Sequence, residues 1–156
     1  MHFFKKYFSF IIVVLFLVFF AFFLNQNNNF FEKTNNSEIK YAKIAGQTIK
    51  VTLATTLLEQ ERGLSGKEIL KEDEGMLFVF QKPSKNYFWM KDMKFSIDII
   101  WIDENFRVIY LEKGVSPESY PLAFGPKENS KYVLEVLAGF SEKNNLKEKD
   151  SVKFLR

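Results

Sequence analysis

The chain has 156 residues, 47% of them hydrophobic, and its 22 basic and 19 acidic side chains give a net charge of +3. That length accommodates one ordinary domain, which excludes large multidomain enzymes. The absence of cysteine excludes disulfides, thiol nucleophiles and cysteine metal sites. The only histidine is His2, so a Ser-His-Asp triad and a histidine metal cage are excluded from the rest of the chain.

The N-terminal segment is the most hydrophobic part of the chain, with 11 of the 19 phenylalanines before residue 32. Residues 7–24 form an apolar run that as a helix would extend about 27 Å, close to the hydrocarbon thickness of a bilayer. Two lysines precede the run, so the positive-inside bias keeps the N-terminus in the cytoplasm. A cleaved signal peptide is the alternative, but the run is long and ends on bulky side chains. We therefore expect residues 1–24 to be an uncleaved, single-pass signal-anchor.

The next segment, residues 25–37, is rich in asparagine and low in complexity, which predicts a tether. Beyond it, residues 38–156 carry 19 basic and 18 acidic side chains. Because this part is almost neutral and has no basic stripe, we expect no nucleic-acid partner. The sequence predicts a monomeric extracytoplasmic domain over residues 38–156.

The hydrophobic pattern of this domain is mostly that of strands. Residues 39–44 and 48–54 alternate around Ala45-Gly46-Gln47, which predicts a hairpin. The capping-box spacing of Thr56 and Glu59 predicts a short helix over residues 57–62, ended by Gly63. The stretch 64–75 is turn-rich.

More strands are predicted in the second half of the domain. They cover residues 76–80 and 87–90, joined by a turn through Pro83, and then residues 97–102, 107–111, 132–136 and 152–155. A long loop runs through Pro117, Pro121 and Pro126, and residues 138–144 form a second short helix. The expected fold class is α+β, mostly β: a small barrel-like or rolled sheet of about seven to eight strands with two short helices.

Several sequence blocks in this order resemble one family. They are Glu-Arg-Gly-Leu (61–64), Glu-Gly-Met-Leu-Phe-Val-Phe (74–80), Phe-Trp-Met-Lys-Asp-Met (88–93), Ile-Asp-Ile-Ile-Trp-Ile-Asp (97–103), Tyr-Val-Leu-Glu-Val-Leu-Ala-Gly (132–139) and Asp150-Ser151-Val152. The chain resembles the bacterial and archaeal family known as domain of unknown function 192 over about residues 48–155. The resemblance implies a compact β-rich fold with short helices and brings no established activity.

The chain departs from the family pattern at three positions. Gln60 stands where the family usually has an arginine, so an anion contact would fall to Arg62 instead. Asn145 and Lys149 stand where the family usually has glycine. Asparagine tolerates the left-handed conformation well, so we expect the end of the second helix to be kept at Asn145.

The most distinctive candidate site is the Phe88–Lys91 block. In a strand, Trp89 and Lys91 share one face while Phe88 and Met90 share the other. If Phe88 and Met90 pack inward, Trp89 lies outside beside a cation, as a platform for a sugar ring or another planar ligand. The alternative is that Trp89 caps the hydrophobic core, since large aromatic side chains more often pack than bind.

Two carboxylates lie in apolar strands. Asp98 shares a face with Ile100 and Ile102, and must be paired or hydrogen-bonded if it is ionised there. It is either a structural acceptor of backbone N–H groups, the favoured interpretation, or a functional acid, base or ligand contact. Glu135 alternates with Leu134 and Val136 in the same way, and the two carboxylates, if they face each other, would have the layout of a glycosidase pair.

These residues lead to one expected function and two alternatives. We expect a membrane-anchored binding or accessory module, rather than an enzyme, for a small polar or glycan-like ligand at the cell surface, without metal or cofactor. Its candidate ligand-binding residues are Arg62, Trp89, Lys91, Asp98 and Glu135. The first alternative is a carboxylate-dependent hydrolase of cell-surface glycans. The second is a copper-binding domain that uses the thioethers of Met90 and Met93, which also suit core packing.

Overall fold

The computed structural model describes residues 13–22 and 38–156. They fall into two compact units, divided between Glu38 and Ile39. In the first unit, residues 13–22 form a helix with exposed side chains. Among the described residues, no helix has both the length and the apolar character needed to cross a bilayer. The predicted anchor and tether extend over residues 1–12 and 23–37, which lie outside the described ranges.

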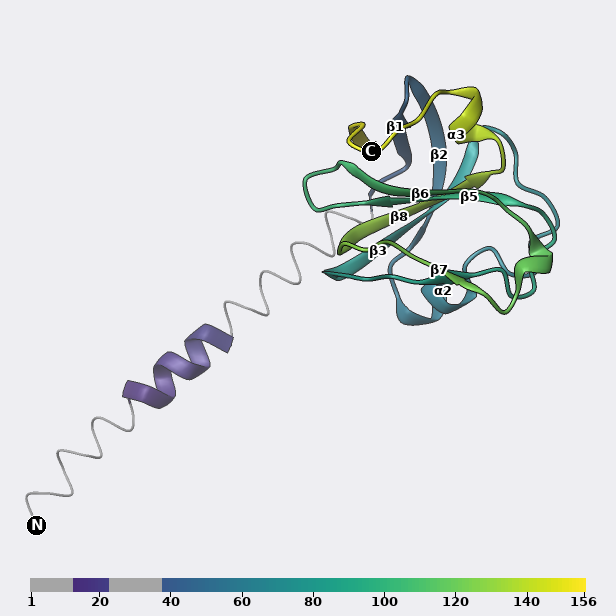
Figure 1. Ribbon diagram of the computed structural model, residues 1–156. Helices are drawn as coiled ribbons and strands as arrows, with labels where there is room; N and C mark the ends of the chain where they lie inside the picture. Colours follow the sequence, from purple (N-terminus) through teal and green to yellow (C-terminus); the bar gives the residue numbers. More distant parts are fainter. Residues whose placement is uncertain (1–12, 23–37) are drawn as a thin grey trace, which may run out of the picture. The chain divides into compact units, whose positions relative to one another are not determined.

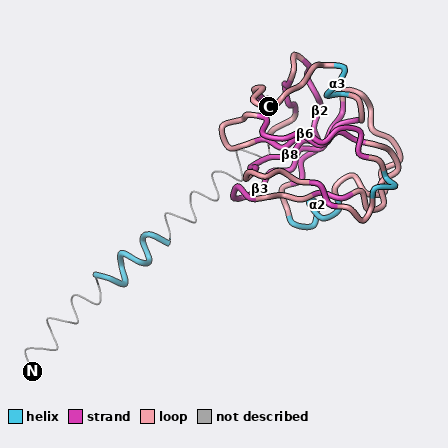
Figure 2. Tube along the Cα trace, viewed as in Figure 1, coloured by secondary structure: helices cyan, strands magenta, loops and turns pink. Residues whose placement is uncertain are grey.

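The second unit is built on one seven-stranded sheet with the strand order β6-β5-β8-β3-β2-β1-β9. Its strands are β1 (Tyr41–Ile44), β2 (Gln47–Ala54), β3 (Glu74–Ser84), β5 (Ile97–Ile102), β6 (Val108–Val115), β8 (Ser130–Leu137) and β9 (Val152–Leu155). Neighbouring strands are antiparallel except β2 and β3, which are parallel. A separate two-stranded sheet pairs β4 (Phe88–Trp89) with β7 (Ala123–Phe124). Figure 2 shows that strands and loops make up most of this unit.

The two edges of the large sheet meet where β6 and β9 begin. An isolated bridge pairs Arg107 with Ser151. The amide of Val108 donates to the carbonyl of Asp150, and the amide of Val152 to that of Phe106, each at 2.9 Å. The sheet is therefore rolled into a half-barrel, and the expected mostly β, barrel-like fold is confirmed.

Each face of the central strands is covered by its own hydrophobic cluster, because side chains alternate between faces. The first cluster includes Ile100 and Leu134, with Phe140 from α3. The second cluster lies on the other face and includes Phe78, Ile99, Trp101 and Val133. Both faces of β5 and β8 are thus buried, which suits the mostly apolar sequence of β5. Strand β8 is buried to the same extent although it contains Ser130, Lys131 and Glu135.

Two α-helices and one 3-10 turn complete the unit: α2 (Leu57–Arg62), α3 (Phe140–Lys143) and η1 (Pro117–Ser119). In Figure 1, α2 lies at the bottom of the unit and α3 near the top. The predicted capping box of α2 is confirmed. Glu59 N donates to Thr56 Oγ1 and Thr56 N donates to Glu59 Oε2. The helix ends at Gly63, whose φ is 51°.

The predicted hairpin and the predicted end of the second helix at Asn145 are also present, and Ala45, Asn145 and Lys149 are non-glycine residues with a positive φ. The β1–β2 hairpin turns through Ala45 and Gly46, both with positive φ, as a two-residue hairpin turn requires. Asn145 follows α3 with a φ of 51°, so asparagine takes the left-handed position there. Lys149 takes a φ of 75° just before the end of the turn that leads into β9.

The predicted turn through Pro83 between residues 76–80 and 87–90 is wrong. Strand β3 continues through Pro83 to Ser84, and β4 pairs with β7 instead of β3. Pro83 is tolerated because its part of β3 is exposed and lies where the β3–β8 register is interrupted, so no ladder bond needs its missing N–H. The long loop predicted through the three prolines contains two elements that the pattern did not indicate, η1 and β7.

Candidate functional site

A pocket of about 320 Å³ opens on the side of the sheet that carries the second cluster. It is lined from three parts of the chain that are distant in sequence: α2 with the residues after it, the end of β3 with the segment leading into β4, and β8. The lining residues are Leu57, Gln60, Glu61, Arg62, Gly63, Leu64, Ser65, Phe78, Phe80, Lys85, Asn86, Tyr87, Phe88, Trp89, Met93 and Glu135. Arg62, Trp89 and Glu135 are thus brought to one pocket.

Glu135 is the buried acid of this pocket. It lies on β8 opposite Met76 of β3 and Ile99 of β5, and only 4% of its surface is exposed. Its Oε2 atom is buried and has no hydrogen-bond partner among the described residues. Burial alone raises the pKa of the Glu135 carboxyl to about 8, so at neutral pH the group is mostly protonated.

A glycine keeps Glu135 close to the neighbouring strand. A Cβ atom at Gly75 would lie 2.7 Å from the backbone oxygen of Glu135 and 3.1 Å from Ile49 Cγ2. Because the first of these contacts is with backbone, the strand pair β3–β8 tolerates only glycine there. The Glu-Gly-Met sequence thus sets the position of the acid at the base of the pocket.

The mouth of the pocket is aromatic. Trp89 is 55% exposed, and its ring makes an edge contact with Tyr120, the two centroids being 6.4 Å apart. Phe88 turns inward, with edge contacts to Phe78 and Trp101, and Met90 is buried. The predicted alternation is therefore confirmed: Trp89 lies outside, and Phe88 and Met90 pack inward.

Tyr87 and two cations complete the lining on the exposed side. The Tyr87 ring lies against Gly125. A Cβ atom at Gly125 would lie 2.5 Å from the ring, so only glycine leaves room for the ring in this position. Arg62 and Lys85 are exposed and make no ion pair with another described residue. Gln60 donates from Nε2 to the carbonyl of Val79 at 3.0 Å, fastening α2 to the end of β3.

Asp98 lies outside this pocket, and its role is structural. It is fully buried and accepts three backbone N–H groups: Gly114 at 2.8 Å and Gly139 at 3.2 Å on Oδ1, and Ser141 at 2.8 Å on Oδ2. The carboxylate thus joins β5 to β6 and to the start of α3. Asp98 pairs with Val136 while Ile99 pairs with Glu135, so the two acids face opposite sides of the sheet. The two acids therefore do not have the glycosidase-like layout that the hydrolase alternative required.

Lys91 is also separate from the pocket lining. It is exposed, and its carbonyl accepts the Ser65 hydroxyl at 2.8 Å, which fastens the loop after α2 to the segment after β4. Met90 and Met93 pack into the second cluster, in agreement with the core alternative for these side chains.

Sequence reasoning missed Gln60, Tyr87 and Phe80 as pocket residues. Gln60 had been noted only as a departure from the family pattern. Tyr87 and Phe80 carried no signal of their own, because their place in the pocket depends on the pairing of β4 with β7 and on the length of β3.

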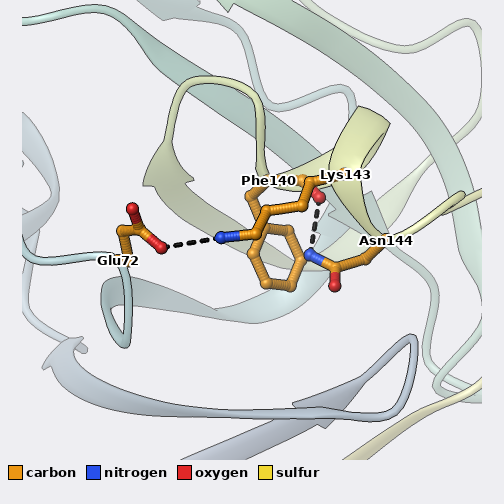
Figure 3. Close-up of polar contacts among 4 residues, drawn as sticks. All are labelled: Glu72, Phe140, Lys143 and Asn144. Carbon is orange, nitrogen blue, oxygen red and sulfur yellow. Dashed lines mark hydrogen bonds and ion pairs between the residues drawn. The ribbon is translucent and has the colours of Figure 1, made fainter.

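A second pocket, of about 390 Å³, lies beside α3. Figure 3 shows the Lys143 ammonium reaching Glu72, with Nζ 2.8 Å from Oε2, while Asn144 Nδ2 donates to the carbonyl of Phe140 at 2.8 Å. The hydrogen bond from Lys143 lowers the pKa of Glu72. Since the charged groups in Figure 3 pair with each other, this pocket presents no counterpart of the unpartnered acid in the first.

The fold has counterparts among solved structures. A protein of unknown function from Novosphingobium aromaticivorans DSM 12444 is 26% identical, with a TM-score of 0.70, and the match covers 74% of this chain and 84% of that one. A protein from Sinorhizobium meliloti 1021 described as a proposed transcription regulator is 24% identical, with a TM-score of 0.69, covering 73% of this chain and 92% of that one. The second likeness concerns the fold alone.

No curated protein matches the chain significantly. Residues 40–154 match the model of the family described as "DUF192: Uncharacterized ACR", a match that spans the whole rolled sheet except its last position, Leu155. The chain therefore belongs to the DUF192 family of uncharacterised proteins.

Proposed function

We propose that the protein is a binding module, and that the pocket between α2, β3, β4 and β8 takes a small polar, ring-bearing ligand of the glycan type. The observation that carries the proposal is the unpartnered Oε2 of Glu135. Leaving a buried polar atom without a partner costs free energy, on the order of 1–3 kcal/mol. A bound ligand that hydrogen-bonds to this atom recovers that cost, which favours occupancy of the pocket.

The mouth of the pocket supports a ring-bearing ligand. More than half of the Trp89 surface is exposed, although burying a large aromatic side chain stabilises a protein. The ring is held in place by its contact with Tyr120 and by the pairing of β4 with β7. A rigid aromatic ring that is exposed beside a pocket offers a flat apolar face at a small entropic cost. The apolar face of a sugar ring suits that surface, while its hydroxyl groups suit Glu135.

The geometry favours binding over hydrolysis. Glycosidases of the common type need two carboxyl groups on the same substrate, and Asp98 lies on the opposite face from Glu135. The other acid of the pocket lining, Glu61, lies on the exposed surface of α2.

The test is a binding screen with matched variants. The full chain is titrated calorimetrically with a panel of neutral and acidic mono- and disaccharides, and binding is compared in Trp89→Ala, Glu135→Leu and Lys91→Ala. Lys91→Ala is the control, because Lys91 lies next to Trp89 in sequence but outside the pocket. We expect the first two variants to lose binding at least about tenfold and the control to keep it. Equal affinity in all three variants, or no binding by any sugar, would contradict the proposal.

We further propose that residues 7–24 anchor the protein in the cytoplasmic membrane and that residues 38–156 are extracytoplasmic. The apolar run and the two lysines before it support this topology. Protease added outside spheroplasts should remove the domain, which should be membrane-attached before treatment. A freely soluble product that starts near residue 25 would point instead to a cleaved signal peptide.

A further inference from the structure

We propose that Glu135 recognises its ligand as a neutral acid, donating its O–H to an uncharged oxygen of the ligand. This inference rests on the proposed binding function and narrows the ligand class. It favours molecules that place a carbonyl or hydroxyl oxygen at the base of the pocket, and disfavours amines that would place a cation there.

The packing around the carboxyl explains why it is neutral. The residues paired with Glu135 are Met76 on β3 and Ile99 on β5, both apolar, and Val133 lies two residues before it on the same face of β8. None of these neighbours supplies a charge or a hydrogen-bond donor. The carboxylate form would therefore lie in an apolar site without compensation, which is the arrangement that keeps a carboxyl protonated.

The charged and titratable groups that face this side are remote or already occupied. From α2 they are Glu61 and Arg62, and from the segment before β4 they are Lys85 and Tyr87. From β3 the group is Glu74, which pairs with Lys67 at 3.7 Å and Lys71 at 3.8 Å, and from β6 it is Glu112, which accepts the Tyr110 hydroxyl at 2.6 Å. From β8 itself it is Lys131, which is buried four residues before Glu135 and whose Nζ donates to the carbonyl of Gln81 at 2.8 Å. None of them makes a hydrogen bond or ion pair with Glu135, and burial alone accounts for the raised pKa of its carboxyl.

Arg62 and Lys85 also bear on the choice between a neutral and a cationic ligand. Both line the pocket and are exposed without an acidic partner among the described residues, whereas Glu61 supplies a single negative charge. The lining is therefore net positive while Glu135 is protonated, which repels a cation as it approaches. A neutral ligand meets no such barrier and finds an O–H donor at the base.

A protonated carboxyl also has its own recognition pattern. It offers one donor and one acceptor side by side. A pair of neighbouring hydroxyls can present an acceptor beside a donor. An acetamido group, which is trans, presents its carbonyl oxygen alone to the O–H of the carboxyl. An N-acetylated amino sugar combines this carbonyl with a ring whose apolar face fits Trp89.

The test compares two matched probes, methyl N-acetyl-β-D-glucosaminide and methyl β-D-glucosaminide. They differ only in having a neutral acetamido group or a basic amino group. Dissociation constants for the full chain are measured between about pH 6 and about pH 9, together with those of Glu135→Gln and Glu135→Leu. Lys91→Ala serves as the control outside the pocket.

The proposal predicts that the N-acetylated probe binds more tightly than the amine. Its affinity should be constant up to about pH 7 and fall about tenfold by pH 9, as the carboxyl loses its proton. Glu135→Gln keeps a donor but cannot ionise, so its affinity should not depend on pH. Glu135→Leu should bind weakly at every pH, and Lys91→Ala should follow the pH profile of the unaltered chain.

The opposite results would overturn the inference in distinguishable ways. Tighter binding of the amine than of the N-acetylated probe at about pH 6, where the amine is charged, would mean that Glu135 binds as a carboxylate. Binding of the N-acetylated probe that is lost in Trp89→Ala but unaffected by pH would leave the binding function standing and contradict the role of Glu135. Absence of binding by either probe and by every other sugar would contradict the proposed function itself.

Discussion

Asp98 and Glu135 lie on adjacent strands, one residue out of register, and their side chains leave opposite faces of the sheet. The two buried carboxyls consequently meet opposite environments. Asp98 accepts three backbone N–H groups, whereas Glu135 has one oxygen without any partner among the described residues. Similar sequence contexts, an acid inside an apolar strand, thus give a structural carboxylate in one case and a pocket acid in the other.

Replacing Asp98 with asparagine should destabilise the protein by about 1–3 kcal/mol. The amide oxygen accepts more weakly than a carboxylate, and the new NH₂ group would face either the N–H of Ser141 or the N–H groups of Gly114 and Gly139. Denaturant melts at neutral pH measure the loss. Asp73→Asn is the matched control, because Asp73 is exposed, and its melt should be almost unchanged. An Asp98→Asn variant as stable as the unaltered protein would contradict the structural role.

The stability of the protein should depend on pH through Glu135. Its pKa is raised from 4.5 to about 8 in the folded state, so the folded protein binds more protons than the unfolded chain between these values. The contribution of Glu135 to the free energy of unfolding is therefore largest below about pH 4.5. It falls by on the order of 4 kcal/mol as the pH rises to 8.

Glu135→Gln isolates this contribution. The variant cannot ionise, so the difference in unfolding free energy between it and the unaltered chain should shift in its favour as pH rises from about 5 to about 8. Urea melts at several pH values measure the difference. A constant difference would show that the Glu135 pKa is not raised.

The sequence predicted the parts of the fold that depend on local signals. The hairpin at Ala45-Gly46, the capping box that starts α2, and the alternation in Phe88–Met90 were all present in the structure. The parallel pairing of β2 with β3 and the pairing of β4 with β7 were not predicted. These contacts join segments that are separated by a helix or a long loop, and no short-range pattern carries that information.

The candidate site was predicted in part, for a similar reason. The sequence indicated Glu135 because it is an acid among apolar residues. It indicated Trp89 because the strand alternation places this ring on the opposite face from Phe88 and Met90. The face that each acid occupies depends on strand register. A shift of one residue would move an acid from the face that carries the pocket to the opposite face of the sheet. Asp98 was therefore grouped with residues that it does not join. Lys91 was grouped wrongly for another reason, because β4 ends at Trp89 and the alternation does not continue to Lys91.

Gly75→Ala should destabilise the protein by about 1–3 kcal/mol, because the added methyl group meets the backbone oxygen of Glu135 at 2.7 Å. The strain falls on the β3–β8 pair, so sugar binding should weaken along with stability. Gly66→Ala tests a different cause: Gly66 has open space for a Cβ and a positive φ of 74°, so its cost is conformational alone. Thermal melts of both variants, with binding measured below each transition, separate the two. A Gly75→Ala variant with unchanged stability and unchanged sugar binding would show that neither depends on the close approach of β3 and β8.

The two tryptophans form a natural pair for the last prediction. Trp101 is fully buried, and its Nε1 donates to the carbonyl of Asn86 at 2.7 Å, whereas Trp89 is 55% exposed. Trp101→Ala should cost about 3–5 kcal/mol, as truncations of buried aromatic side chains do. Trp89→Ala should cost less than about 2 kcal/mol, because most of its ring is outside the packed cluster. Urea melts followed by circular dichroism measure both losses without relying on tryptophan emission. A loss above about 3 kcal/mol in Trp89→Ala would assign that ring to the core and remove the platform from the pocket, whereas a small loss together with weaker sugar binding is the result expected of a binding residue.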